Sequence, residues 1–139
     1  MTVTRLLTAA NLAVLAGCAT IAIDHQDRAA GLARLTTNPD RINLTAAITS
    51  AVLTLENGCL ALRIHNGRTL PVIWPESSEL AQDGRGVAVA GKRFSIGDRL
   101  DIGGSTSDTI PATETEIIGS FACRGPYVIA NAVHHGRPR

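Results

Sequence analysis

Two adjacent histidines near the C-terminus are the first candidates for chemistry in this 139-residue chain. His134 and His135 follow Cys123, Glu114 and Glu116, and imidazole, thiolate and carboxylate are the ligands that zinc prefers. Metal ligands must converge on one ion, whereas neighbouring side chains of a strand point to opposite faces. We therefore expect a disordered, solvated tail over residues 134–139, no metal site and no cofactor.

His65 and several serines are the candidates for nucleophilic catalysis. His65 precedes Asn66-Gly67, a pair typical of a tight turn. The chain has no nucleophile elbow, P-loop, HExxH motif or dinucleotide fingerprint. Turn chemistry explains these residues best, so we assign no catalytic residue and keep a small hydrolase or metal-binding enzyme as the alternative function. Only folding could bring Ser95 or Asp98 near His65. A Gly-Ser-rich loop is a separate candidate nucleophile site, with Ser105, Ser107 and Asp108.

Trp74 is the only tryptophan, and it stands before Pro75 at the expected end of a strand. A tryptophan offers a large apolar face and one hydrogen-bond donor. It can therefore fill a core or stack on a ligand at the mouth of a small barrel. Core packing is the favoured role, and Trp74 remains a candidate ligand contact.

The N-terminal residues carry the most specific signal in the sequence. Arg5 gives a short first segment its positive charge, and residues 6–15 form an apolar run that ends in Leu15-Ala16-Gly17-Cys18. The run is too short for a membrane-spanning helix, which needs ~20 residues, and suits a secretory signal peptide. The tetrapeptide resembles the lipobox of bacterial lipoprotein signal peptides. That resemblance implies a signal peptide over residues 1–17 and lipidation of Cys18, which anchors the exported chain to membrane lipid.

The residue after the lipobox cysteine bears on the destination of the protein. Ala19, rather than an aspartate, follows Cys18. By resemblance to Gram-negative lipoproteins, this favours the periplasmic face of the outer membrane. In a Gram-positive cell the anchor would lie in the outer face of the cytoplasmic membrane.

Charge and aromatic content argue against a nucleic-acid partner. Loss of Arg5 from the 13 basic residues would leave 12 against 12 acidic residues, and aromatic residues make up 3% of the chain. A neutral domain has no electrostatic footprint for phosphates, and few aromatic residues leave no platform for stacking bases. An envelope protein or a small ligand remains as the partner class.

Two cysteines remain once Cys18 is assigned to lipid. Cys59 and Cys123 are an even number in an exported chain, and oxidising compartments favour disulfides in small domains. The alternatives are a reactive thiol or a metal site, but neither cysteine belongs to a CxxC motif. We predict a disulfide that ties the second strand to the last one.

From residue 46 onward, β-branched residues and period-two alternation predict strands. Asn57-Gly58 predicts a hairpin turn, and a second turn at 65–67 continues the chain into a three-stranded meander. Pro71 has no amide proton, so its strand is expected at an edge or with a bulge. Ala29 to Leu35 could form two helical turns before Pro39. Further strands are expected at 87–90, 93–96, 99–102 and within 123–133, and loops at 75–86, 103–108 and 109–120.

These elements predict an all-β fold: a small, partly open OB-like β-barrel of six to seven short strands. The expected barrel domain covers residues 46–133. It follows the signal peptide of residues 1–17 and a tether, residues 18–45, that contains the short helix. Closing the sheet would remove edges that otherwise pair with neighbours.

The domain also resembles a group of uncharacterised small bacterial lipoprotein and secreted domains. The resemblance covers roughly residues 46–133, implies the fold and brings no activity. Our leading hypothesis is therefore a lipid-anchored, non-enzymatic envelope domain with a binding or structural role. The residues that carry the resemblance are Gly58-Cys59-Leu60, Pro71-Val72-Ile73-Trp74-Pro75, Gly97-Asp98, Gly103-Gly104 and the terminal Cys123.

Overall fold

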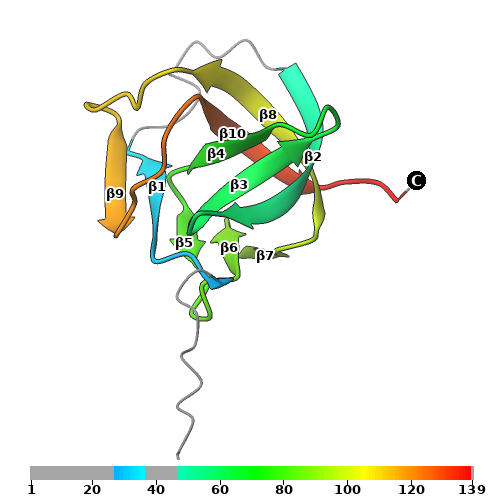
Figure 1. Ribbon diagram of the computed structural model, residues 1–139, viewed down its shortest axis with the longest axis horizontal. Coiled ribbons are helices and arrows are strands. Elements are labelled where there is room, and N and C mark those ends of the chain that lie inside the picture. The colour runs from blue at the N-terminus through cyan, green and yellow to red at the C-terminus, as the bar shows by residue number, and fades with distance from the viewer. Residues whose placement is uncertain (1–26, 37–46, 139) are drawn as a thin grey trace, which may run out of the picture.

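The computed structural model describes residues 27–36 and 47–138. Within these ranges the chain forms ten β-strands and no α-helix (Figure 1), so the all-β prediction is confirmed. The strands are β1 (Gly31–Leu35), β2 (Ala47–Glu56), β3 (Cys59–Ile64), β4 (Thr69–Trp74), β5 (Ser78–Leu80), β6 (Gly86–Val89), β7 (Lys92–Ser95), β8 (Arg99–Ser107), β9 (Thr115–Gly119) and β10 (Tyr127–His135).

Seven strands form one curled sheet in the order β10-β8-β2-β3-β4-β1-β9. β2, β3 and β4 are the expected antiparallel meander, and β8 pairs with both β2 and β10. β10 also returns to β4, in parallel, through the residue pairs Val128–Val72 and Ile129–Ile73. This last contact spans only two residue pairs, and Ile73 is also paired with Ala33 of β1. The sheet is therefore partly ringed and not a barrel.

Tight turns join two hairpins: the first lies at the predicted Asn57-Gly58, and the second lies one residue before the turn expected at 91–92. Asn57 and Gly58, between β2 and β3, have positive φ angles of 51° and 77°. Ala90 and Gly91, between β6 and β7, have φ angles of 51° and 80°. Positive φ at both central residues matches the right-handed twist of the flanking strands. β5, β6 and β7 form a separate three-stranded sheet.

Pro71 is accommodated without placing β4 at the edge of the sheet. The Ile64 amide donates to the Arg68 carbonyl at 3.0 Å, which fixes the alternation of hydrogen-bonded pairs between β3 and β4. Pro71 lies opposite Ala61 in a pair that exchanges no hydrogen bonds. Its nitrogen therefore faces away from β3, just before β10 joins the other side of β4 at Val72.

The helix and tether predicted before residue 46 are wrong for the described part of that segment. Gly31–Leu35 forms β1, which pairs in parallel with β4 and antiparallel with β9. Leu32 is buried in one core cluster, and Ala33 and Leu35 are buried in another. Because both faces of β1 are covered, its sequence shows no polar alternation, and the domain includes residues well before 46.

Three predicted loops also contain strands, and the predicted tail does too. β8 runs through Gly103-Gly104 to Ser107. A Cβ at residue 104 would collide with the Ile129 carbonyl of β10, so β8 can continue past β10 because residue 104 is glycine. Only glycine allows this close crossing of two strands. β5 lies in the expected loop at 75–86, β9 lies in the expected insertion at 109–120, and β10 continues to His135.

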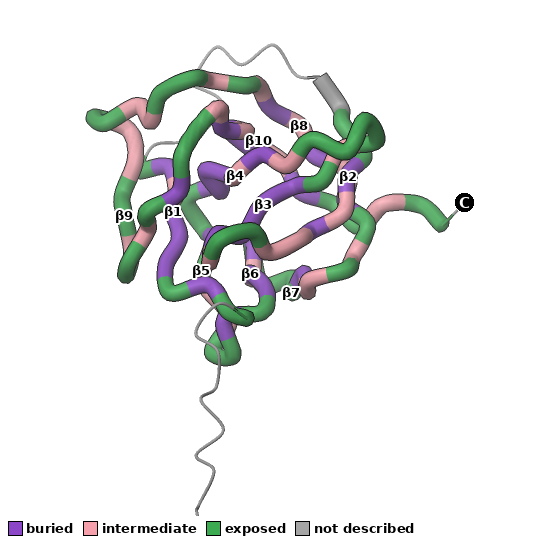
Figure 2. Tube along the Cα trace, viewed as in Figure 1, coloured by how far each residue is buried: buried purple, intermediate pink, exposed green. Residues whose placement is uncertain are grey.

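The buried residues, which are purple in Figure 2, include the members of two hydrophobic clusters. The ring core lies inside the curl and includes Leu53, Leu62, Trp74 and Ile102. The outer core lies between the ring and the segments that cover it; its members are Ala33, Leu35, Cys59, Ile73, Cys123, Tyr127 and Ile129. None of the described residues belongs to a helix long and apolar enough to cross a bilayer.

Candidate functional site

A cavity of about 390 Å³ opens at one end of the ring. It lies where β2, β4 and β10 begin and where β3 and β8 end. Alternation along these strands turns every second side chain toward the interior of the ring, so the cavity lies against the same strand faces as the ring core. Its lining residues are Thr49, Leu62, Ile64, Leu70, Ile102, Gly104, Ser105, Thr106 and Val128.

The other end of the ring is filled. Trp74, at the end of β4, and Leu100, at the start of β8, pack there with side chains of the small sheet. Phe94 and Val87 are fully buried members of the same cluster, and in Figure 1 the small sheet lies below the ring. The ring is therefore a cup with one closed end and one accessible end.

The chemistry of the cavity is that of an uncharged apolar site. Its walls are mainly aliphatic, with hydroxyl groups from Thr49, Ser105 and Thr106, and none of the described side chains that line it is ionisable. Thr49 and Thr106 are exposed, whereas Leu62 and Ile102 are buried deeper in the wall. Such a site can enclose an apolar molecule and hydrogen-bond one polar end. The described lining offers its hydroxyl groups no ionisable side chain that could activate them as nucleophiles.

Trp74 belongs to the core and not to the cavity. Its exposed fraction is 1%, and it packs in the ring core on the inward-facing side of β4. Trp74 therefore has the core-packing role, and it is not among the residues that line the cavity.

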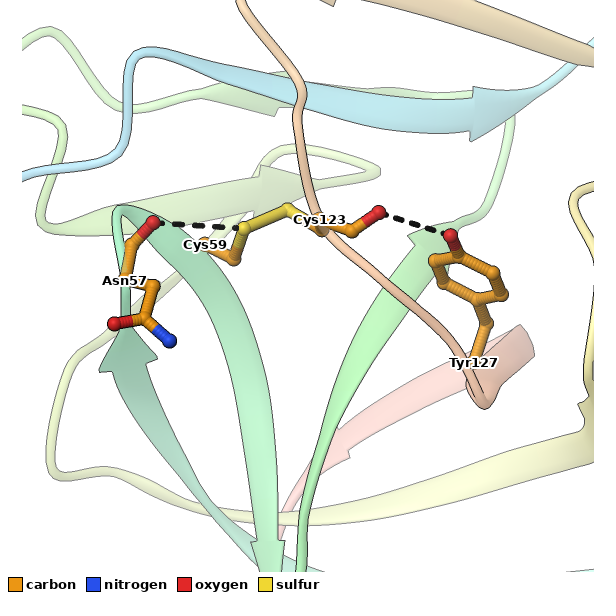
Figure 3. The surroundings of a disulfide bond; sticks show 4 residues. All are labelled: Asn57, Cys59, Cys123 and Tyr127. Atoms are coloured by element: carbon orange, nitrogen blue, oxygen red, sulfur yellow. Dashed lines mark hydrogen bonds between the residues drawn. A yellow bond between two sulfur atoms is a disulfide. The ribbon is translucent and has the colours of Figure 1, made fainter.

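The predicted disulfide between Cys59 and Cys123 is confirmed (Figure 3). It joins β3 to the segment before β10 and forms part of the outer core. The Tyr127 hydroxyl donates to the Cys123 carbonyl at 2.9 Å and fixes this segment further. Cys59 Sγ also lies 3.9 Å from the Asn57 carbonyl oxygen, but an oxidised sulfur carries no hydrogen to donate.

The candidate catalytic residues are separated and serve in turns. His65 is exposed in the β3–β4 turn. Asp98 accepts a hydrogen bond from the Ser95 amide at 2.7 Å, and the Ser107 hydroxyl donates to the Thr109 carbonyl at 2.7 Å. These contacts stabilise local turns. His65 shares a surface cleft with Ser50 and with none of the serines singled out from the sequence.

The candidate metal ligands are also dispersed. His134 lies in a cleft of about 680 Å³ with Glu76 and Lys92, and all three side chains are exposed. His135 stacks on Phe94 with ring centroids 4.5 Å apart. The other ligands proposed from the sequence have separate roles, since Cys123 is in the disulfide and Glu116 pairs with Arg34. Among the residues that the structure describes, no three such side chains could hold one metal ion.

One carboxyl group has a clearly shifted pKa, and it lies away from the cavity. Asp83 accepts a hydrogen bond from the Arg85 amide at 2.9 Å and forms an ion pair with Arg93 at 2.8 Å. The backbone hydrogen bond, followed by the Arg93 side chain, lowers the pKa of Asp83. Because the carboxyl group is fully exposed, this shift belongs to a surface turn and not to a site.

Comparison of the chain with protein-family models, curated proteins and solved structures finds no match. The arguments for its function therefore rest on its own residues. The lipobox and Cys18 lie outside the described residues.

The sequence did not point to the residues that line the cavity. Ile64 and Leu70 flank a turn, and Gly104 and Thr106 belong to a stretch expected as a loop. The available signal was the alternation of Leu60, Leu62 and Ile64, which places one face of β3 inside the ring. Finding the cavity also required knowing that β8 and β10 cross beside it, which is a property of the tertiary fold.

Proposed function

We propose that this chain is a lipid-anchored protein of the cell envelope that binds a small apolar ligand in the ring cavity, without catalysing a reaction. The observation that carries the proposal is an aliphatic cavity with hydroxyl groups at its rim and, among the residues that the structure describes, no ionisable lining side chain. The lipobox ending at Cys18 supports the anchor, and the disulfide agrees with an oxidising compartment. In a Gram-negative cell the protein would face the periplasm from the outer membrane.

The cavity defines the class of ligand. Its volume of about 390 Å³ equals the liquid volume of roughly thirteen water molecules, which suits a ligand with a similar number of non-hydrogen atoms. The ligand would be uncharged along its length, because a buried charge without a partner is costly. One hydroxyl or carbonyl group would reach Thr49, Ser105 or Thr106. An aliphatic alcohol of medium length represents this class.

A substitution at the rim tests the ligand site. Thr106 is exposed and lies at the mouth on β8, so Thr106→Trp should fill the opening without disturbing the buried core. Binding of decan-1-ol, followed by chemical-shift changes of the β8 and β10 amides, should weaken by about tenfold or more, equivalent to 1.4 kcal/mol.

Arg63→Trp is the matched control for this experiment. Arg63 is exposed on β3 between Leu62 and Ile64, so its side chain lies on the outer face of the same wall. This variant should bind decan-1-ol like the native chain. Equal binding by Thr106→Trp and Arg63→Trp, or no binding of the alcohol by the native chain, would contradict the proposed ligand site.

The anchor is tested separately in cells. Because the lipid is attached through the sulfur of residue 18, Cys18→Ala should move the protein from the membrane fraction to the soluble fraction or leave it as an unprocessed precursor. Mass spectrometry of the native protein should show the added acyl chains, and more than one chain is needed for stable anchoring. A Cys18→Ala variant that stays in the membrane fraction in processed form contradicts the anchor and leaves the ligand site untouched.

A further inference from the structure

β9 is the free edge of the seven-stranded sheet. At the other end of the strand order, β10 is joined back to β4 through Val128 and Ile129, so within residues 27–36 and 47–138 β9 is the one strand of this sheet that has no strand partner anywhere along its second side. In Figure 1, β9 lies at the outside of the molecule beside β1. A free edge presents N–H and C=O groups that can template another strand.

Two hydrogen bonds give the direction of the backbone groups of β9. The Thr36 amide donates to the Glu114 carbonyl at 2.8 Å, and the Ser120 amide donates to the Ala30 carbonyl at 3.1 Å. Both pairs continue the β1–β9 register. Because hydrogen-bonded pairs alternate along an antiparallel ladder, the even-numbered residues of β9 bond to β1 and the odd-numbered residues face outward. The N–H and C=O of Ile117 therefore face the free edge.

The side chain of Ile117 is unusual in its exposure. Its exposed fraction is 46%, and it is the one exposed large hydrophobic side chain in the part of the chain that the structure describes. β9 contains no lysine or proline, the residues that commonly protect an edge strand. Its single charge, on Glu116, is paired with Arg34 at 3.0 Å. The edge thus combines open backbone groups with an apolar side chain and little charge.

We propose that this edge is a self-association surface, at which two copies of the chain pair β9 with β9 in antiparallel orientation, centred on Ile117. In this register the Ile117 amide of each copy donates to the Ile117 carbonyl of the other. The two isoleucine side chains lie opposite each other and cover one another, which stabilises a cross-strand pair. The contact is isologous, so it closes as a dimer and does not propagate.

The charges of the edge agree with a second copy as the partner. When the two strands pair with Ile117 at the centre, Glu116 of one strand lies opposite Ile118 of the other, and Thr115 lies opposite Gly119. No charged residue of β9 faces a like charge directly, and each Glu116 keeps its own Arg34. Gly119 has a φ angle of 68° and ends the regular strand, so the paired segment is short. We therefore expect a weak, reversible dimer, because the interface is at the low end of the size range of specific contacts.

Cysteine cross-linking tests both the association and its register. Hydrogen-bonded residues of an antiparallel pair have Cα atoms about 5.5 Å apart, within the range that a disulfide can bridge. In the full chain carrying Cys18→Ser, Ile117→Cys should form a covalent dimer on mild oxidation. Ile118→Cys should not form the dimer. Residue 118 of one copy lies opposite residue 116 of the other, so the two copies of residue 118 are two positions out of register and lie more than about 7 Å apart. Thr113→Cys, outside the strand and exposed, is the second control.

A proline substitution tests the backbone contact without a new thiol. Ile117→Pro removes an outward N–H and leaves the β1–β9 hydrogen bonds of residues 116 and 118 in place, so the fold should persist by circular dichroism. The dissociation constant of the dimer, from sedimentation velocity, should rise by about tenfold or more. The proposal would be overturned if Ile117→Cys failed to cross-link or if residues 117 and 118 cross-linked equally. It would also be overturned if the native chain stayed monomeric up to about 1 mM, since the dissociation constant of the dimer would then be above about 1 mM.

Discussion

At the scale of single residues, the disulfide does more than close a loop. Cys59 and Cys123 are 64 positions apart, and their bond holds the segment before β10 against β3. The Tyr127 hydroxyl binds the Cys123 carbonyl from the same cluster, in which Ile73 and Leu35 are fully buried. The outer core therefore depends on a covalent link between β3 and the segment before β10, which are far apart in the sequence.

Removal of this link should weaken the fold substantially. The double variant Cys59→Ala with Cys123→Ala should lower the free energy of unfolding by about 4 kcal/mol, because the unfolded chain regains the entropy of an open loop of this length. Urea unfolding, followed by tryptophan fluorescence of the buried Trp74, measures the change.

Reduction provides the control for the disulfide variant. In the presence of a reductant, the native chain and the double variant should unfold at similar urea concentrations, since neither then has the bond. A double variant within about 1 kcal/mol of the oxidised native chain would show that the outer core holds without it.

The role of Trp74 is another property that appears at this scale. Trp74 lies on the same face of β4 as Leu70 and Val72, and this face is turned toward the interior of the ring. Strand alternation in the sequence indicates which face they share, but it does not indicate which end of the ring is filled. The choice between core and ligand contact therefore required the packing of the small sheet beneath Trp74.

At the scale of elements, the predictions succeeded where the signal is local. Asn57-Gly58 lies in the predicted turn, and Ala90-Gly91 lies in a turn one residue before the one expected at 91–92; the hairpins β2–β3 and β6–β7 form around them. In each case the turn residues and the alternating flanks are contiguous in the sequence. Neighbouring residues then determine the pairing, and no distant partner is needed.

The elements that were missed depend on distant partners. β1 pairs with β4 along one edge and with β9 along the other, and a core cluster covers each of its two faces. It therefore lacks the polar alternation of a half-buried strand. β9 is a strand because β1 pairs with it, and its own sequence reads as a polar loop containing Ile117 and Ile118. Gly104 seemed to end β8, but it lets β8 pass close to Ile129 of β10. Sequence alone cannot supply these contacts, because each arises from a second segment far along the chain.

At the scale of the whole molecule, the cavity arises from how the ring is closed. Five strands turn their apolar faces inward, and the small sheet supplies Phe94 and Val87 to fill one end only. The opposite end keeps its aliphatic walls with no comparable plug among the described residues, and there the cavity forms. The all-β class was predictable from the sequence, whereas an accessible cavity at one end was not.

The place of β1 in the whole molecule gives a final prediction. A chain that begins at residue 37 lacks β1, so the buried Leu32 and Leu35 are lost from the two cores, and β9 loses the pairing that defines it. Truncating one buried leucine to alanine typically costs 2–5 kcal/mol, and two such losses already approach the whole stability of a small domain, about 5–15 kcal/mol.

This shortened chain should therefore lose its cooperative thermal transition, as followed by circular dichroism. A chain that begins at residue 27 keeps β1 and the hydrogen bond from the Ala29 amide to the Gly84 carbonyl, and it should keep the transition. If both chains unfold sharply at the same temperature, β1 is an accessory to a domain that starts after residue 46. If only the longer chain does so, the strand is part of the domain, because it covers β4, orders β9 and is buried in both cores at once.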